Sequence, residues 1–221
     1  SIDTAAPISD RMTNPTTRRA VLGFAGAIAA LSLLGAGAAQ ALDSEQQAEI
    51  ARVEAYLNGI QSLSARFVQI GPNGELARGQ LYMRRPGRLR FEYEPPTPIL
   101  IVADGLWLVM QDKELGQVNR FPLYETPLGV LVAKTVDLSD GVEVRRVERQ
   151  AGILRVTVID SDRPDEGSLT IAFSDPPLLL RQWQVLDARG GVTHVALTDI
   201  RVNLPLKPEL FTFIDPPAFQ R

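Results

Sequence analysis

Residues 79–93 read GQLYMRRPGRLRFEY, and this stretch decides the fold. It predicts two strands, the first over 79–85, joined by a Pro-Gly turn. In the second strand apolar and charged residues alternate, so Leu89, Phe91 and Tyr93 share one face while the other face is charged. Two such strands in succession indicate an antiparallel hairpin with one apolar face.

The last residue of the first strand, Arg85, carries a charge in an apolar row. Strand parity places it on the same face as Leu81 and Met83. A guanidinium in that position must find hydrogen-bond partners or reach water. The residues alone leave two interpretations open: Arg85 extends into solvent at the strand end, or it makes a specific polar contact. Its neighbour Arg84 lies on the opposite face with Tyr82.

The rest of the chain shows the same signals at short intervals. Turn residues such as Gly71–Gly74, Asp104–Gly105 and Asp187–Gly191 separate apolar or alternating runs. With the central hairpin, these runs predict ten or eleven antiparallel strands in one domain whose sheet curls. The further predicted strands are 67–70, 99–102, 106–110, 117–121, 142–148, 153–159, 168–173, 179–186 and 192–200.

Two helices are predicted besides the sheet. Ser44-Glu45-Gln46-Gln47 has the capping-box pattern and starts the first helix. The second is a short apolar helix over 128–133, with Thr126 as its cap and Pro127 in its first turn. The apolar residues of the first helix recur every three or four positions and form one stripe: Ile50, Val53, Leu57 and Ile60.

The N-terminal part has the pattern of a bacterial export signal. Arg18-Arg19 is followed by a Gly- and Ala-rich apolar run and then by the small-residue cleavage pattern Ala39-Gln40-Ala41. A membrane anchor is the alternative, because the run is long enough to span a bilayer at about 20 residues. The expected division is residues 1–11 upstream of the signal, 12–41 a twin-arginine signal peptide, and 42–221 a single mature domain.

Composition excludes several classes of site. The chain has no cysteine, which excludes disulfides, thiolate metal sites and thiol nucleophiles. Its net charge is −3 and it has no basic run, so it lacks the footprint of a nucleic-acid-binding protein. The single histidine, His194, lies in an alternating strand pattern rather than in a catalytic motif. We therefore expect no catalytic residue, no metal and no cofactor, with a carboxylate-based hydrolase as the alternative from another class.

Six stretches occur in an order that is typical of one protein family. Besides 79–93, these are SARFVQ (64–69), IVADG (101–105), TPL (126–128), WQVLD (183–187) and FTFIDPP (211–217). Together they resemble the LolA family of periplasmic outer-membrane lipoprotein carriers, over essentially the whole predicted mature domain. The resemblance implies an incomplete, half-open antiparallel β-barrel whose apolar inner face is covered by helices that act as a lid.

The resemblance implies a carrier rather than an enzyme. It implies a monomeric periplasmic chaperone that takes acylated lipoproteins from an ABC-type release complex in the inner membrane and delivers them to a receptor at the outer membrane. By matching position, Arg85 would hydrogen-bond to the lid helices and hold the empty cavity closed. The alternative within this fold is a related periplasmic protein that binds lipids or senses the state of the envelope.

The expected acyl-chain-binding residues come from the helices and from one face of the strands. Parity does not tell which of them line a cavity and which form a permanent core. Burying one methylene is worth roughly 0.8 kcal/mol, so a fully sheltered long acyl chain would be held by on the order of 10 kcal/mol. A carrier must therefore shelter its chains only in part. The expected residues are Ile50, Val53, Leu57, Phe67, Leu81, Met83, Leu89, Phe91, Tyr93, Trp107, Leu128 and Leu131.

Overall fold

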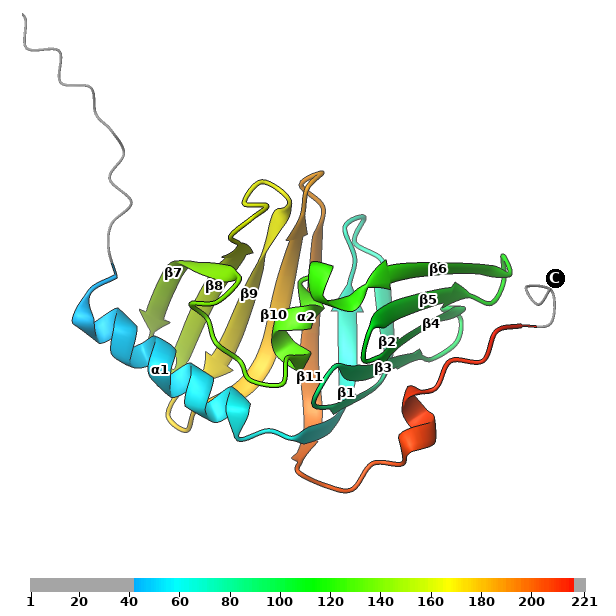
Figure 1. Ribbon diagram of the computed structural model, residues 1–221, viewed down its shortest axis with the longest axis horizontal. Coiled ribbons are helices and arrows are strands. Elements are labelled where there is room, and N and C mark those ends of the chain that lie inside the picture. The colour runs from blue at the N-terminus through cyan, green and yellow to red at the C-terminus, as the bar shows by residue number, and fades with distance from the viewer. Residues whose placement is uncertain (1–41, 217–221) are drawn as a thin grey trace, which may run out of the picture. The chain divides into compact units, whose positions relative to one another are not determined.

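The computed structural model describes residues 42–216 (Figure 1). Their fold is mainly β, with eleven strands in one sheet, two α-helices and two 3-10 helices. The predicted signal peptide, the residues before it and residues 217–221 lie outside the described residues. Between residues 42 and 216, no helix is long and apolar enough to cross a membrane.

The eleven strands follow one another along the chain with only short connections, except between the sixth and the seventh. That longer connection holds one 3-10 helix and one α-helix. The strands are β1 (Ser62–Ile70), β2 (Leu76–Arg84), β3 (Arg88–Tyr93), β4 (Ile99–Asp104), β5 (Trp107–Asp112), β6 (Gln117–Pro122), β7 (Val142–Gln150), β8 (Ile153–Asp160), β9 (Gly167–Ser174), β10 (Leu179–Asp187) and β11 (Val192–Val202).

Neighbouring strands are all antiparallel, in the order β6-β5-β4-β3-β2-β1-β11-β10-β9-β8-β7. The first and last strands pair in the middle, where Phe67 of β1 lies opposite Leu197 of β11. Within the described residues the edge strands β6 and β7 are not paired with each other, so the sheet does not close. The prediction of an incomplete antiparallel barrel is confirmed.

Some strands begin earlier than their sequence pattern predicts. β1 starts at Ser62 rather than Phe67, because Leu63 pairs with Met83 on one side and with Val202 on the other. β2 likewise starts before Gly79. Pairing with a distant strand extends a ladder beyond the local alternation, so the ends could not be placed from the pattern alone.

The first helix, α1 (Ser44–Asn58), begins with a capping box that is shifted by one residue from the predicted one. The Oδ1 atom of Asp43 accepts a hydrogen bond from the Gln46 N–H (2.8 Å), and Gln46 Oε1 accepts from the Asp43 N–H (3.1 Å). Asp43 and Gln46 have the same spacing as the predicted Ser44 and Gln47. A carboxylate is further favoured there by the positive end of the helix dipole.

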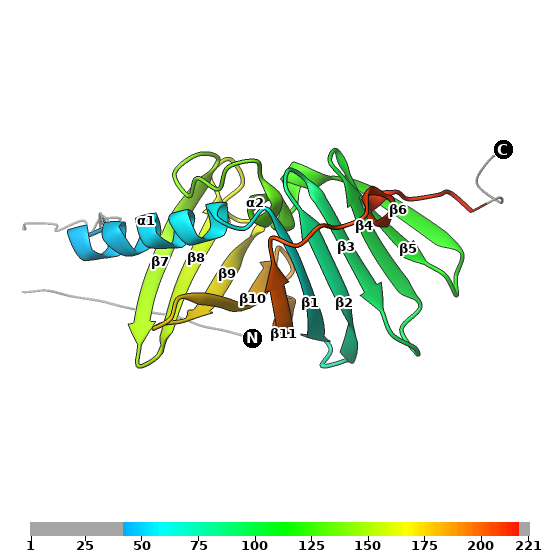
Figure 2. The same ribbon diagram turned by 90° about the horizontal axis from the view of Figure 1, so that it is seen from below.

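Both α-helices lie on the same face of the sheet, which we call the inner face (Figure 2). α1 runs across β7, β8 and β9, and its Tyr56 ring contacts Phe173 edge-on, with 5.8 Å between ring centroids. The 3-10 helix η1 (Leu123–Glu125) and α2 (Leu128–Val132) lead the chain from β6 toward β7. The buried residues of the two α-helices are Val53 and Leu57 of α1 and Gly129, Leu131 and Val132 of α2.

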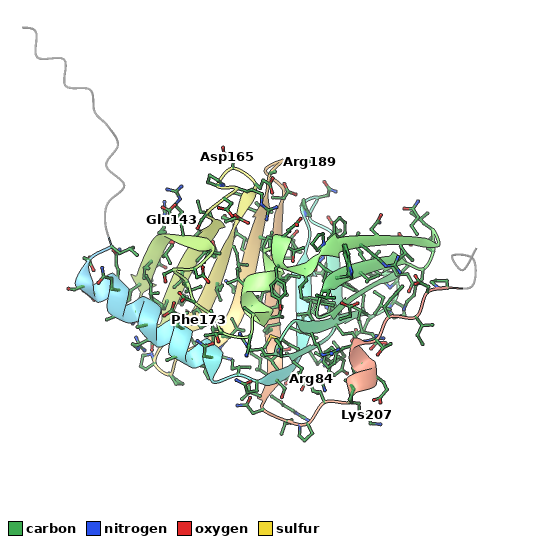
Figure 3. The ribbon with its side chains drawn as sticks, in the orientation of Figure 1. Arg84, Glu143, Asp165, Phe173, Arg189 and Lys207 are labelled. Carbon is green, nitrogen blue, oxygen red and sulfur yellow. The ribbon has the colours of Figure 1, made fainter. Side chains whose placement is uncertain are left out.

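The segment after β11 covers part of the opposite face, which we call the outer face. Its 3-10 helix η2 (Pro208–Phe211) contacts β3 and β4, and Phe211 is buried there. Arg84, which is labelled in Figure 3, places its guanidinium 5.1 Å from the centroid of the Phe211 ring. On the same face Val102 and Val109 pair across β4 and β5 and are both buried. These two strands therefore carry buried apolar residues on both faces.

Candidate functional site

A large apolar cavity of about 720 Å³ lies on the inner face. Its strand side is formed by residues such as Phe91, Trp183 and Val195, which come from both halves of the sheet. Its helix side is formed by Pro127 and Leu128, where the chain enters α2. Side chains at the ends of the strands and in the adjoining turns give the cavity a polar rim: Gln69, Glu75, Thr97, Asp187 and Thr193.

Packed aromatic rings fix the floor of this cavity. Phe67 contacts Phe91 and Tyr93 edge-on, at 5.1 and 5.0 Å between ring centroids. Phe91 also contacts Trp183 edge-on at 6.2 Å. Such pairs hold ring orientations more firmly than aliphatic contacts do. The Tyr93 hydroxyl donates to Gln69 Oε1 (2.8 Å), and burial raises the pKa of Tyr93 to about 12, so it stays neutral.

A glycine allows the floor to pack this closely. A Cβ atom at Gly79 would lie 2.8 Å from the Phe67 ring and 2.1 Å from the carbonyl oxygen of Glu92. Both distances are far inside van der Waals contact, so a side chain at this position would displace Phe67. The close packing of the cavity floor therefore requires a glycine at position 79.

Arg85 joins the central hairpin to the end of α2. Its side chain is 8% exposed, and its Nη1 atom donates to the carbonyl oxygen of Ala133 (2.9 Å). The Gly87 N–H donates to the carbonyl oxygen of Val132 (2.7 Å). Carbonyl groups at a helix C-terminus lack intrahelical partners and carry partial negative charge, so they suit these donors. Burial lowers the pKa of Arg85 to about 10, which leaves it charged at neutral pH; within residues 42–216 its Nε has no hydrogen-bond partner.

Charged residues hold α1 to the far half of the sheet. Asp175, which is 5% exposed, accepts hydrogen bonds from Arg52 of α1 (3.0 Å) and from Arg149 of β7 (2.7 Å). Glu49 of α1 pairs with the same two arginines. The hydrogen bonds from Arg52 and Arg149 hold the pKa of Asp175 below its ordinary value. The cluster therefore joins α1, β7 and the turn between β9 and β10.

Two further contacts tie α1 to the loop that follows α2. The Asn58 side chain donates to the carbonyl oxygen of Val136 (2.9 Å) and accepts from its N–H (2.8 Å). The carboxylate of Glu54 accepts from the Leu138 N–H (2.7 Å). Because this loop continues directly from α2, these hydrogen bonds join the two helices through it.

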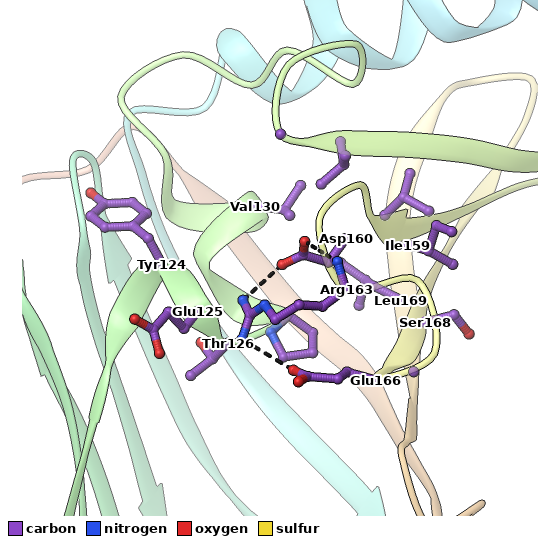
Figure 4. A pocket seen from close by; sticks show the side chains of 15 residues that line it. Tyr124, Glu125, Thr126, Val130, Ile159, Asp160, Arg163, Glu166, Ser168 and Leu169 are labelled. Atoms are coloured by element: carbon purple, nitrogen blue, oxygen red, sulfur yellow. Dashed lines mark hydrogen bonds and ion pairs between the residues drawn. The ribbon is translucent and has the colours of Figure 1, made fainter.

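A smaller pocket of about 100 Å³ lies between α2 and the β8–β9 turn (Figure 4). Thr126 and Val130 line one side of it. Arg163, on the other side, donates to Asp160 (2.8 Å) and Glu166 (3.1 Å). The guanidinium in this pocket is therefore already paired with two carboxylates. Across residues 42–216 no group of three histidine, cysteine, aspartate or glutamate side chains stands close enough to hold a metal ion.

The residues predicted to bind acyl chains fall into three groups in the structure. Phe91, Tyr93 and Leu128 line the large cavity. Trp107 does not, because it lies on the outer face of β5 with Val109 and is 45% exposed; this differs from the prediction. The other eight belong to the core beside the cavity, where the helices pack against the sheet: Ile50, Val53, Leu57, Phe67, Leu81, Met83, Leu89 and Leu131.

Several lining residues were missed by the sequence reasoning. Trp183 and Val195 lie opposite each other on β10 and β11, and Ile101 and Met110 on β4 and β5. The alternation in β10 and β11 does place Trp183 and Val195 on one face. What the sequence lacked was the pairing of β11 with β1, which brings this face to the central hairpin.

The sequence matches a known protein family. The family model for the outer membrane lipoprotein carrier protein LolA matches residues 58–214. An outer-membrane lipoprotein carrier protein of Chromobacterium violaceum is 30% identical over 178 residues, which cover 77% of this chain and 85% of that protein. One of Legionella pneumophila (strain Corby) is 32% identical over 184 residues, covering 78% and 88%.

Among solved structures, a LolA superfamily protein from Nitrosomonas europaea covers 74% of this chain and 97% of its own, at 14% identity and a TM-score of 0.40. The family match takes in the central hairpin, Arg85 and the strands that form the cavity. By this match, which spans well over half of its length, the chain belongs to the LolA family.

Proposed function

We propose that this protein is a periplasmic carrier that shelters the acyl chains of lipoproteins between the inner and the outer membrane. The observation that carries the proposal is the 720 Å³ apolar cavity, open at a polar rim and roofed by a helix that the sheet holds through polar contacts. An apolar cavity with a polar rim suits a ligand with an apolar chain and a polar head. The names of the relatives, outer-membrane lipoprotein carrier proteins, support the same ligand.

Loading enlarges the cavity by moving the helices. Phe67, Leu81 and Met83 are buried in the core next to the cavity, and lifting α2 and its loop would add them to the lining. Each methylene that enters gains roughly 0.8 kcal/mol, part of which is spent on separating the helices from the sheet. Ligand affinity is thereby kept low enough for release, since the apolar side chains that loading would add to the lining are already covered in the closed state.

Arg85 holds the closed state in this proposal. Its hydrogen bond to Ala133 exists only while α2 lies against the central hairpin. A buried guanidinium without its acceptor is costly, so the contact favours the closed arrangement. The proposed partners are an ABC-type release complex in the inner membrane and a receptor at the outer membrane, with a monomeric carrier moving between them. We propose no catalytic step.

The test is the release of a lipoprotein from the inner membrane. Purified protein without the predicted signal peptide is incubated with spheroplasts that synthesise a labelled outer-membrane lipoprotein, and the supernatant is assayed for a stoichiometric complex. We expect such a complex with the parent protein. A folded protein that leaves the lipoprotein on the membrane would contradict the proposal.

A matched pair of variants links this result to the cavity. Leu128→Glu places a charge in the cavity lining, whereas Leu115→Glu makes the same change at an exposed turn. We expect Leu128→Glu to form little complex and Leu115→Glu to behave like the parent. Equal complex formation by both variants would show that the acyl chains bind elsewhere.

A further inference from the structure

A polar pocket of about 350 Å³ lies on the outer face, away from the cavity. It is formed where β1, β2 and β11 run side by side in the middle of the sheet (Figure 2). The outer face has an unusual composition along the four central strands β3, β2, β1 and β11. Strand alternation places several arginines on this face of the four strands, but only two carboxylates, those of Glu92 and Asp199. The outward arginines are Arg66, Arg78, Arg84, Arg88, Arg90 and Arg201. This face is therefore basic although the whole chain has a net charge of −3.

A β-bulge creates the hollow. Ser64 pairs with Arg201 and Arg66 with Thr198, so β11 places two residues opposite Ala65 alone. One of the two, Asp199, adopts a positive φ of 52°. A bulge of this kind bends its strand and breaks the regular spacing of side chains. Here it separates the side chains of Arg66 and Arg201 and leaves a pocket between them.

The pocket presents donors and an uncompensated positive charge. Besides the two arginines and Asp199, the pocket is lined by the polar residues Ser64, Gln80 and Tyr82 and by Ala65. Within residues 42–216 neither Arg66 nor Arg201 forms an ion pair with a carboxylate, unlike Arg52, Arg149 and Arg163. Arginine stays protonated at any ordinary pH, so two guanidinium groups against one carboxylate leave a net positive charge.

We propose that this outer-face pocket binds a phosphate-bearing anion, either the headgroup of an anionic phospholipid or free phosphate. Guanidinium groups bind phosphate oxygens through paired hydrogen bonds, and hydroxyl and amide donors add to them. The site is exposed and salt screens it, so single contacts are weak and binding is sensitive to ionic strength. Because the pocket and the cavity lie on opposite faces of the sheet, both can be occupied at once.

Vesicle binding tests the headgroup as the source. Protein without the predicted signal peptide is sedimented with vesicles of equal parts phosphatidylglycerol and phosphatidylcholine, and with phosphatidylcholine alone, at low ionic strength. The double variant Arg66→Gln/Arg201→Gln is compared with Arg145→Gln/Arg155→Gln, which removes the same charge from another outer-face hollow. Each basic residue at an anionic membrane surface contributes about 1 kcal/mol of binding free energy, so the Arg66→Gln/Arg201→Gln variant should bind the anionic vesicles about 30-fold more weakly than the parent. The Arg145→Gln/Arg155→Gln variant should bind them nearly as the parent does.

A titration with inorganic phosphate tests the free anion. We expect the backbone amide resonances of Ser64 and Arg66 to shift on addition of phosphate, and not with chloride at equal ionic strength. Both arginines are exposed, so unchanged thermal melting of the variants serves as the folding control. Response to vesicles alone identifies the headgroup, and response to phosphate in solution identifies the free anion; either supports the site. No response in either assay, or equal loss in the two double variants, would overturn it.

Discussion

The two helices of the inner face are held to the sheet in different ways. α1 is held by a cluster of four charged side chains, Glu49, Arg52, Arg149 and Asp175, and by the Tyr56 hydroxyl, which accepts a hydrogen bond from the Leu180 N–H of β10 (2.9 Å). Against the central hairpin, the end of α2 is held by the Arg85 side chain and one backbone hydrogen bond from Gly87. The difference indicates that α2 moves more easily, with α1 as the firmer support.

The largest expected effect is at the weaker attachment. Replacing Arg85 by leucine removes a charge-assisted hydrogen bond worth about 1.5–3 kcal/mol, which shifts the balance between closed and open states roughly 10- to 100-fold. We expect the variant to take up lipoprotein from spheroplasts but to deliver it poorly to the receptor at the outer membrane. The measurement is the fraction of bound lipoprotein transferred.

The adjacent arginine supplies the control for this prediction. Arg84→Leu removes the same charge on the outer face, where Arg84 contacts Phe211. We expect delivery by this variant to stay near that of the parent. If Arg85→Leu delivers as well as Arg84→Leu does, Arg85 does not hold the closed state.

The second prediction concerns the firmer attachment. Asp175→Asn removes one of the two carboxylates that Arg52 and Arg149 share and leaves Glu49 as their partner, so the attachment of α1 to β7 should weaken and the urea midpoint of unfolding should fall. Glu143→Gln is the control, because its pair with Arg145 is exposed on β7. An equal midpoint for both variants would show that the cluster does not fasten the helix.

The pH dependence of stability follows from the same carboxylate. The pKa of Asp175 in the folded protein lies below its unfolded value of about 3.9. Its stabilising contribution is therefore complete above that value and is lost as the pH falls through the lower folded pKa. Between pH 5 and pH 2, Asp175→Asn should lose less stability than the parent; identical slopes in acid denaturation would contradict this.

A smaller effect is expected where the two helices are coupled. Asn58→Ala removes both hydrogen bonds to Val136, a loss of about 1–2 kcal/mol. We expect amide hydrogen exchange to accelerate in the loop after α2 as well as in the last turn of α1. Gln61→Ala, which removes only a hydrogen bond to the Asn58 carbonyl oxygen, is the control. Faster exchange in α1 alone would show that the helices move independently.

The smallest effect is expected for Trp107, on the outer face of the sheet. Trp107→Ala should leave lipoprotein uptake within about twofold of the parent, because Trp107 is half exposed on the outer face. Phe91→Ala, in the cavity floor, should reduce uptake strongly. Comparable losses in a binding titration would place Trp107 in the ligand site after all.

The inner-face residues that were predicted correctly from the sequence belong to strands that have only one buried face. In the hairpin over 79–93, a side-chain period of two puts Leu81, Met83 and Phe91 on the inner face and brings Arg85 to its end. No tertiary information is needed for that step.

Prediction failed where both faces are covered. Val102 and Val109 are buried on the outer face of β4 and β5, where η2 also contacts β4. Apolar residues then occur at both parities, and the choice that placed Trp107 inside had no physical basis. The Asp175 cluster had no local signal either, because its members come from three segments far apart in the chain.

The missing ladder between β6 and β7 has a consequence for capacity. In a closed barrel, strand number and stagger fix the radius. Here the edge strands β6 and β7 are not paired with each other among the described residues, so no closed ring of hydrogen-bonded strands sets the circumference. The enclosed volume then depends on how far the sheet bends, and bending is a soft degree of freedom. The sheet can thus adjust to ligands of different width without breaking a hydrogen bond between its strands.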